Sequence, residues 1–299
     1  CRILNIRPHI NLSRWGQHRT SNVIVRVRGM CMFLHAEGSI KERTSDVVHL
    51  LSRKCSLEYR SVGYLLCHIP TLRGQCPSDE LHVTTAKRVT IDAPLVQGSF
   101  SLQGARIDDV ILTSYRETLD TESDNIHFLK KASSKAPFFA EFGWASSDAD
   151  QPMPSAQTLW ASDRDLLSPS SPVTLRWDNG KGLVFTRKIS INDDYLIIYD
   201  DSVASSLSTA ITMYPFGLVR RQGTPPTSGI YILHEGALGV FDETLKEEDY
   251  SDLRDAPAGG IKVAPEAAGG WIGITDKYWL AALLPSQQEK FSYSFQLLP

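Results

Sequence analysis

Residues 173–205, VTLRWDNGKGLVFTRKISINDDYLIIYDDSVAS, decide the fold class of this chain. Apolar side chains alternate with polar ones on both sides of Asn179-Gly180, a pair typical of tight hairpin turns. The alternating positions are Val173, Leu175 and Trp177 before the turn, and Leu183, Phe185 and Arg187 after it. A second turn at Asn192-Asp193-Asp194 leads into YLIIYD. The pattern therefore predicts a meander of three long strands.

Similar short segments fill the chain from Val89 onward. They include VTIDAP, GSFSLQGARIDDVILTSYRET with its turn at Gln103-Gly104, FFAEFGWAS, TLWAS, AITMYPFGLVRR and GIYILHEGALGVFD. So many strands exceed an immunoglobulin-type domain, and we expect an all-β fold, a large two-sheet β-sandwich with one or two short helices. Residues 242–253, DETLKEEDYSDL, are predicted to form a helix with Asp242 as its N-cap.

Residues 269–285, GGWIGITDKYWLAALLP, could be a membrane-bound segment, the floor of an active site or a strand pair. The stretch is too short to span a bilayer, and Asp276-Lys277 falls where a hairpin would turn. Apolar positions recur at two-residue spacing on either side, at Ile272 and Ile274 and at Trp279 and Ala281. We predict two paired core strands. The best uncharged stretch elsewhere, residues 202–219, is rich in Ser and contains Pro215, so no transmembrane helix is expected. No secretory signal is expected either, because the N-terminus lacks a basic start followed by an apolar stretch and a small-residue cleavage site.

The overall net charge of −3 conceals a sharp change in composition near residue 88. Residues 1–88 hold 14 Lys and Arg against 6 Asp and Glu, a balance of +8, and the remaining 17 against 28 give −11. All five cysteines and six of the eight histidines also lie before this point. Such a segment could be a nucleic-acid-binding arm, a Cys/His metal module or a segment that does not belong to the fold.

The third interpretation of residues 1–88 is favoured. The cysteines (Cys1, Cys31, Cys55, Cys67 and Cys76) lack the close pairs that structural zinc sites usually have. Basic residues that interleave with apolar ones (Arg26, Arg28, Arg53, Lys54 and Arg60) form no basic run or stacking motif, so no nucleic-acid partner is expected. The segment shows no sustained helical or strand period. We therefore assign residues 1–88 to no domain and expect them to be poorly ordered or mis-framed, and we expect residues 89–299 to form the domain.

Four polar pairs are candidates for functional residues. Asp193-Asp194 and Asp200-Asp201 could bind a metal or act as acid and base, but such pairs more often solvate turns and strand ends. His234-Glu235 resembles a general base with a partner, and Arg220-Arg221 could bind an anion. Each is more simply a surface or structural pair. We therefore predict no catalytic, cofactor-binding or metal-binding residues, and no cofactor.

Several segments resemble the periplasmic domain of the YidC family of bacterial membrane protein insertases, in the Oxa/Alb superfamily. They are VTIDAPLVQGSFSLQGARIDDVILTSYRET, the meander, YPFGLVRRQG and GGWIGITDKYWLAALLP, in the family's order across residues 89–299. The resemblance implies a β-supersandwich like that of galactose-mutarotase-like proteins, on the periplasmic side of the inner membrane. It implies no enzyme activity. Residues 1–88 do not match the family.

The resemblance also implies partners, namely the Sec translocon components SecYEG and SecDF and nascent membrane proteins. Membrane contact would run only through family helices that this chain lacks, so we expect a fragment, and no site residue is transferred. Because fold analogy alone also suggests a carbohydrate-binding or mutarotase-like enzyme, that alternative stays open. Such an enzyme would need acid and base groups around a bound sugar, and His127 and His234 are the domain's only histidines.

Overall fold

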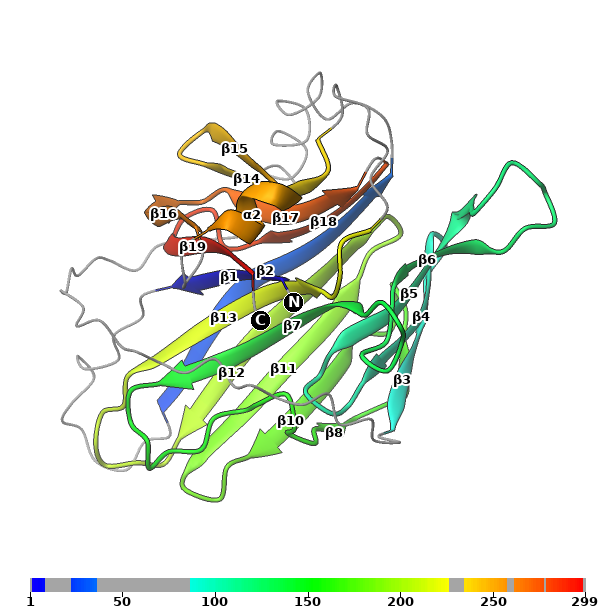
Figure 1. Cartoon of the computed structure of the whole chain (residues 1–299). Helices are drawn as coiled ribbons and strands as arrows, with labels where there is room; N and C mark the ends of the chain where they lie inside the picture. The colour runs from blue at the N-terminus through cyan, green and yellow to red at the C-terminus, as the bar shows by residue number, and fades with distance from the viewer. Residues whose placement is uncertain are drawn as a thin grey trace.

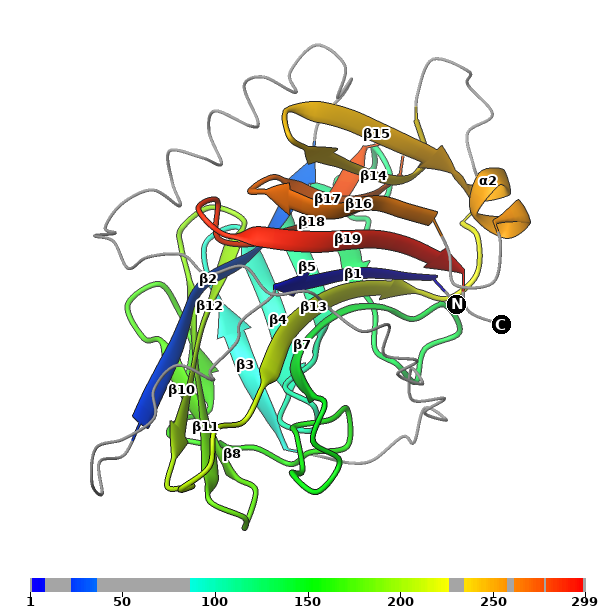
Figure 2. The same cartoon turned by 90° about the vertical axis from the view of Figure 1, so that its left-hand side faces the viewer.

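The computed structural model describes residues 2–8, 23–36, 87–225, 234–256, 261–276 and 278–297. Two large sheets face one another across an apolar core, as the two views in Figure 1 and Figure 2 show. The predicted all-β, two-sheet fold is thus confirmed, and the described residues contain one short helix, α2 (Tyr250–Asp255). Within these ranges, no helix combines the length and apolar character needed to cross a membrane.

In the described parts of the chain, sheet A has ten strands and sheet B has nine. The order across sheet A is β16 (Ile261–Ala268), β19 (Lys290–Leu297), β1 (Arg2–Pro8), β13 (Met213–Arg221), β7 (Phe138–Ser146), β5 (Ile107–Arg116), β4 (Val96–Ser101), β3 (Arg88–Asp92) and β9 (Leu166–Leu167), with β6 (Asn125–Leu129) paired to β5. The order across sheet B is β15 (Thr244–Asp249), β14 (Gly236–Phe241), β17 (Trp271–Asp276), β18 (Trp279–Leu284), β2 (Val23–Ala36), β12 (Leu196–Ser205), β11 (Leu183–Ile191), β10 (Val173–Asp178) and β8 (Ala161–Ser162).

The predicted meander is strands β10, β11 and β12 of sheet B. Trp177 pairs with Phe185, and Phe185 pairs in turn with Val203. Asn179 holds the first turn, since its side-chain oxygen accepts hydrogen bonds from the backbone N–H groups of Lys181 and Leu183. Alternate residues of β11 point into the apolar core, as the two-residue period predicts.

The stretch 269–285 forms the predicted strand pair. Asp276 pairs with Trp279 and Ile272 with Leu283, so β17 and β18 are a tight antiparallel hairpin; Lys277 lies outside the described residues. Both strands are buried on both faces. Ile272, Ile274, Ala281 and Leu283 belong to the main core, whereas Trp271, Leu280, Ala282 and Leu284 belong to a second apolar cluster, hereafter the outer cluster. The period of two thus sends alternate residues to opposite faces of sheet B.

Two segments within residues 1–88 differ from the expectation that this region has no strand period. The structure places β1 between β19 and β13, and β2 between β18 and β12 (Figure 2, dark blue and blue). β2 contains IVRVRG, whose alternation of apolar and basic residues is a strand pattern that we interpreted as basic interleaving. Its partners follow more than 160 residues later, and a local pattern does not show such pairing. The division of the chain at residue 88 stays a prediction.

The helix predicted over residues 242–253 is wrong in its first half. Asp242 and Glu243 are turn residues with φ of 47° and 64°, and Phe241 pairs with Thr244 across them. Two successive positive φ values fit a two-residue hairpin turn, which explains why a strand, β15, follows rather than a helix. α2 begins only at Tyr250, and the Asp252 carboxylate accepts a hydrogen bond from the backbone N–H of Asp249.

Candidate functional site

The first polar cluster of the described residues is a buried ion pair between the two sheets. Arg187 on β11 lies opposite Asp201 on β12, and its side chain is 0% exposed. Its Nε and Nη2 donate to the two carboxylate oxygens of Asp201 at 2.8 and 2.7 Å. Its Nη1 donates to the backbone carbonyl of Phe142 on β7 at 2.9 Å, and Trp144 Nε1 donates to Asp201 at 3.1 Å. The pair therefore connects sheet B with sheet A.

The surroundings of this pair stabilise its charges in place. The guanidinium carbon of Arg187 lies 5.3 Å from the centre of the Trp160 ring and 5.6 Å from that of Tyr199. Burial alone would lower the pKa of Arg187, but the charge and hydrogen bonds of Asp201 outweigh it and raise the pKa. Burial raises the pKa of Tyr199, so its hydroxyl stays protonated. This is a structural clamp, because its charged groups are already paired.

The prediction that Asp200-Asp201 lies at a turn or strand end is wrong. The two residues lie in the middle of β12, which continues to Ser205, and not at a strand end. Asp201 was missed as the partner of a buried arginine because the facing Arg187 can be recognised only once the register of the hairpin is known. Asp193-Asp194 does lie in a turn, where Asn192 Oδ1 accepts the backbone N–H groups of Asp194 and Leu196.

A second polar network surrounds Asp109 on β5. Ser99 pairs with Asp109 and Phe100 with Ile107, so Asp108 is the extra residue of a β-bulge. Arg88 donates to the Asp108 carboxylate and, at 2.8 Å, to Ser99 Oγ. Gly98 has a φ of 139° and lets β4 lie close to β5, because a Cβ at this position would lie 2.0 Å from the Asp109 carbonyl oxygen.

Ser99, Asp109 and His127 are catalytic residue types, but their order is not that of a nucleophilic triad. Ser99 Oγ donates to Asp109 at 2.6 Å, and His127 Nε2 lies 3.0 Å from the other carboxylate oxygen. The carboxylate thus stands between the hydroxyl and the imidazole, so the imidazole does not reach the serine proton. Burial raises the pKa of Asp109, but hydrogen bonds from Ser99 and Lys131 and the charges of Lys131 and Arg88 lower it further than burial raises it.

The third cluster contains the predicted pairs His234-Glu235 and Arg220-Arg221. His234 Nε2 lies 3.0 Å from the Ala237 carbonyl oxygen, and Nδ1 lies 3.1 Å from the Asp249 carboxylate. Arg221 donates to Asp276 on β17 and lies over the Phe138 ring at 4.7 Å. Tyr250 of α2 donates to the other oxygen of Asp276 at 2.9 Å.

These contacts give one member of each predicted pair, His234 and Arg221, structural partners. Arg221 ties β13 of sheet A to β17 of sheet B, and His234 holds the start of β14 against the end of β15. His127 and His234 have different partners on different sheets, so the two imidazoles do not form one acid–base pair. Across the ranges that the structure describes, no group of three or more His, Cys, Asp or Glu is placed to hold a metal ion. Of the cysteines, Cys1, Cys55, Cys67 and Cys76 lie outside those ranges.

The two-sided apolar region of sheet B is the feature that sequence analysis did not single out as a site. Strands β14, β17 and β18 are buried on both faces, and Leu196 of β12 extends the outer cluster. Trp271 Nε1 is buried there without a hydrogen-bond partner. The uninterrupted apolar residues of WLAALL indicate burial on both faces, because a strand that is covered on one face alternates between apolar and polar residues.

The fold and these clusters define the chain as a large two-sheet β-sandwich domain in which the polar networks hold strands together. The family model described as the YidC periplasmic domain matches residues 88–297, more than half of the chain. The chain therefore belongs to the YidC periplasmic domain family.

Curated relatives agree with this assignment. The chain is 44% identical over 234 residues to the membrane protein insertase YidC of Methylorubrum extorquens, covering 76% of this chain and 38% of that protein. It is 43% identical over 233 residues to the protein of the same name from Methylobacterium radiotolerans, with the same shares covered. For that of Nitrobacter hamburgensis the identity is 43% over 216 residues, 71% of this chain and 35% of the relative. The chain thus spans well under half the length of these relatives.

Proposed function

We propose that residues 88–297 serve as the periplasmic part of a YidC-type membrane protein insertase of the bacterial inner membrane. The observation that supports the proposal most strongly is the family match over this range, together with relatives that are named as insertases. In this role the domain contacts components of the Sec translocon, SecYEG or SecDF, or nascent membrane proteins during insertion.

The proposed role is binding without catalysis. The imidazoles and carboxylates that a mutarotase-like enzyme would need have structural partners instead: His127 contacts Asp109, and His234 contacts Asp249. An acid–base mechanism needs such groups to converge on a substrate. A sandwich whose sheets are linked by contacts such as Arg187–Phe142 and Arg221–Asp276 is well suited to present fixed surfaces to a partner.

Site-specific cross-linking tests the proposal. Residues 88–297 would replace the matched part of the Methylorubrum extorquens insertase, with a photoreactive amino acid at exposed Leu119, Leu159 or Tyr278. At least one of these positions should cross-link to SecYEG, SecDF or a nascent membrane protein in cells. The same group at Ile272, which is 0% exposed, should not. Correctly folded chimeras that cross-link to none of these proteins from any exposed position would contradict the proposal.

A further inference from the structure

The turn between β10 and β11 holds the side-chain amide of Asn179 in one orientation. Its Oδ1 accepts the backbone N–H groups of Lys181 and Leu183 at 2.8 and 2.9 Å. Its Nδ2 donates to Gln151 Oε1 at 3.1 Å and to the Pro152 carbonyl at 3.2 Å. A backbone N–H only donates and a carbonyl only accepts, so these partners fix which side-chain atom is oxygen and which is nitrogen. Two donors therefore polarise the side-chain carbonyl of Asn179.

The residues on either side of Asn179 supply a nucleophile and a base. The backbone nitrogen of Gly180 can approach the side-chain carbonyl carbon of Asn179 because glycine has no Cβ in the way. Gly180 is exposed, and a Cβ there would have no atom within 4 Å, so there is room for a ring to close. The Gly180 N–H donates to Asp178 Oδ1 at 2.9 Å. A carboxylate at this distance meets the geometric requirement for a general base.

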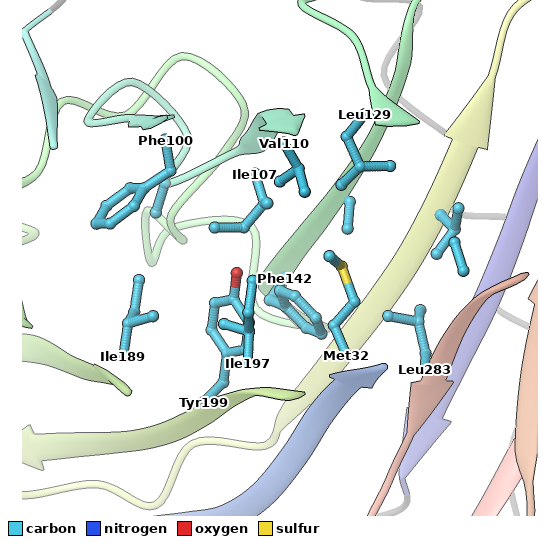
Figure 3. Packing of buried hydrophobic residues seen from close by; sticks show 14 of the residues in the cluster. Met32, Phe100, Ile107, Val110, Leu129, Phe142, Ile189, Ile197, Tyr199 and Leu283 are labelled. Carbon is cyan, nitrogen blue, oxygen red and sulfur yellow. The ribbon is translucent and has the colours of Figure 1, made fainter. Parts of the chain in front are cut away.

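The strands of the hairpin hold these groups in position. Asp178, the last residue of β10, pairs with Val184 of β11, and Leu183, which supplies one of the two donors, is 0% exposed. Further along β11, Ile189 pairs with Tyr199 and lies in the core between the sheets (Figure 3). Because β11 is anchored in this way, its N–H donors are oriented before any reaction begins.

We propose that Asn179 is a site of self-catalysed deamidation. The Gly180 nitrogen attacks Cγ of Asn179, and Asp178 takes the Gly180 proton. The N–H groups of Lys181 and Leu183 stabilise the negative charge that forms on Oδ1. The bond between Cγ and Nδ2 then breaks, and Nδ2 leaves as ammonia with the proton that Asp178 returns. A cyclic imide remains, and water opens it at either carbonyl to give aspartate or isoaspartate at position 179.

The reaction changes the contact between the turn and residues 150–152. Asn179 Nδ2 is the donor to the Pro152 carbonyl, and a carboxylate in its place only accepts. Two acceptors do not form a hydrogen bond, so the product loses this link and gains a negative charge. The modification is a one-way change, and it does not depend on the proposed insertase role.

The next turn of the meander provides a matched control within the chain. Asn192 Oδ1 accepts the backbone N–H groups of Asp194 and Leu196 at 3.1 and 3.0 Å, as Asn179 Oδ1 accepts its two donors. The flanking residues differ, however. Ile191 carries no carboxylate, and Asp193 has a side chain next to the nitrogen that would attack. Asn192 should therefore stay intact under conditions in which Asn179 reacts.

The test follows positions 179 and 192 in the full chain at neutral pH by peptide mapping and mass spectrometry. A synthetic peptide of residues 173–184 has the same Asn-Gly pair without the fold. Position 179 should convert at least about tenfold faster in the folded chain than in the peptide, because the base and the donors are in place only in the fold. Asp178→Ala should remove most of this advantage in the chain and leave the rate in the peptide almost unchanged.

Two results would overturn the proposal: a folded chain that converts no faster than the peptide, or an Asp178→Ala chain that converts as fast as wild type. Equal conversion at positions 179 and 192 would contradict it as well, since Asn192 has no base beside it. Far-ultraviolet circular dichroism checks that Asp178→Ala, at an exposed position, keeps the fold. If it does not, the comparison of the wild-type chain with the peptide still decides the proposal, because that comparison needs no substitution.

Discussion

Arg187 is a fully buried charged residue whose guanidinium is paired by its neighbours. Its guanidinium is 0% exposed and is held by Asp201, the Phe142 carbonyl and two aromatic rings. A buried ion pair contributes little compared with an apolar pair of the same size, but losing one partner leaves an uncompensated charge in the interior. The clamp is therefore a place where single and paired substitutions should differ.

Arg187→Met should lower the free energy of unfolding by about 3–5 kcal/mol, because Asp201 then loses its partner in the interior. Urea denaturation followed by tryptophan fluorescence measures the change. Lys188→Met, at the exposed neighbouring position, should shift stability by less than about 0.5 kcal/mol. The double variant Arg187→Met/Asp201→Leu should be more stable than Arg187→Met alone. If it is less stable, the charge pair is not what makes the single substitution costly.

Asp109 gives a prediction about pH. Its pKa in the folded protein lies below the ordinary value of 3.8, so its contribution to stability is complete above that value and is lost as the pH falls through the folded pKa. The difference in unfolding free energy between wild type and Asp109→Asn should shrink as the pH falls below about 4. Asp124→Asn, at an exposed loop position, serves as the control. A difference that grows as the pH falls below about 4 would mean that the pKa of Asp109 is raised instead.

At the scale of the elements, the turn between β14 and β15 decides whether residues 242–249 are helix or strand. The composition of DETLKEED favours a helix, yet Asp242 and Glu243 adopt the left-handed backbone of a hairpin turn. The pairing of Phe241 with Thr244 fixes that turn. Strand pairing in the sheet outweighs the local helix propensity of these residues, and that pairing cannot be predicted from the local sequence.

Glu243→Gly should raise the free energy of unfolding by about 0.5–1 kcal/mol, because glycine adopts a φ of 64° without the steric cost that glutamate bears. Thermal unfolding followed by circular dichroism detects the change. Glu247→Gly, in the middle of β15, should instead be destabilising, since the backbone there is extended. Equal losses at both positions would show that residue 243 lies in regular structure.

The sequence predicted some elements better than others for a physical reason. Hairpins such as β10–β11 and β17–β18 join neighbouring segments, so alternation and turn residues such as Asn179 and Gly180 predict them directly. β2 pairs only with strands far along the chain, and its alternation can be matched to partners only when the sheet order is known. The sequence holds no catalytic motif, and that no catalytic residue is expected stays a prediction, whereas the roles of Arg187 and Asp109 depend on strand register.

At the scale of the whole molecule, the two sheets share one core to which β2 contributes Met32. Met32→Ala should lower the free energy of unfolding by about 2–4 kcal/mol, because it leaves a cavity between the sheets. Leu119→Ala, at a fully exposed position on the β5–β6 loop, should have almost no effect. The two values can be compared by urea denaturation. A neutral Met32→Ala would place residues 23–36 outside the core.

The central claim is that β2 completes sheet B of this chain between β12 and β18. Disulfide trapping tests it directly: Cys31 pairs with Ile198, so Ile198→Cys should form a disulfide with Cys31 under mild oxidation. Ser202→Cys lies on the same strand, about 13 Å further along, and should not reach Cys31. Mass spectrometry of proteolytic peptides from the folded chain identifies the linked cysteines. We predict the Cys31 linkage in the first variant only; its absence there, or equal yields in both, would contradict the account.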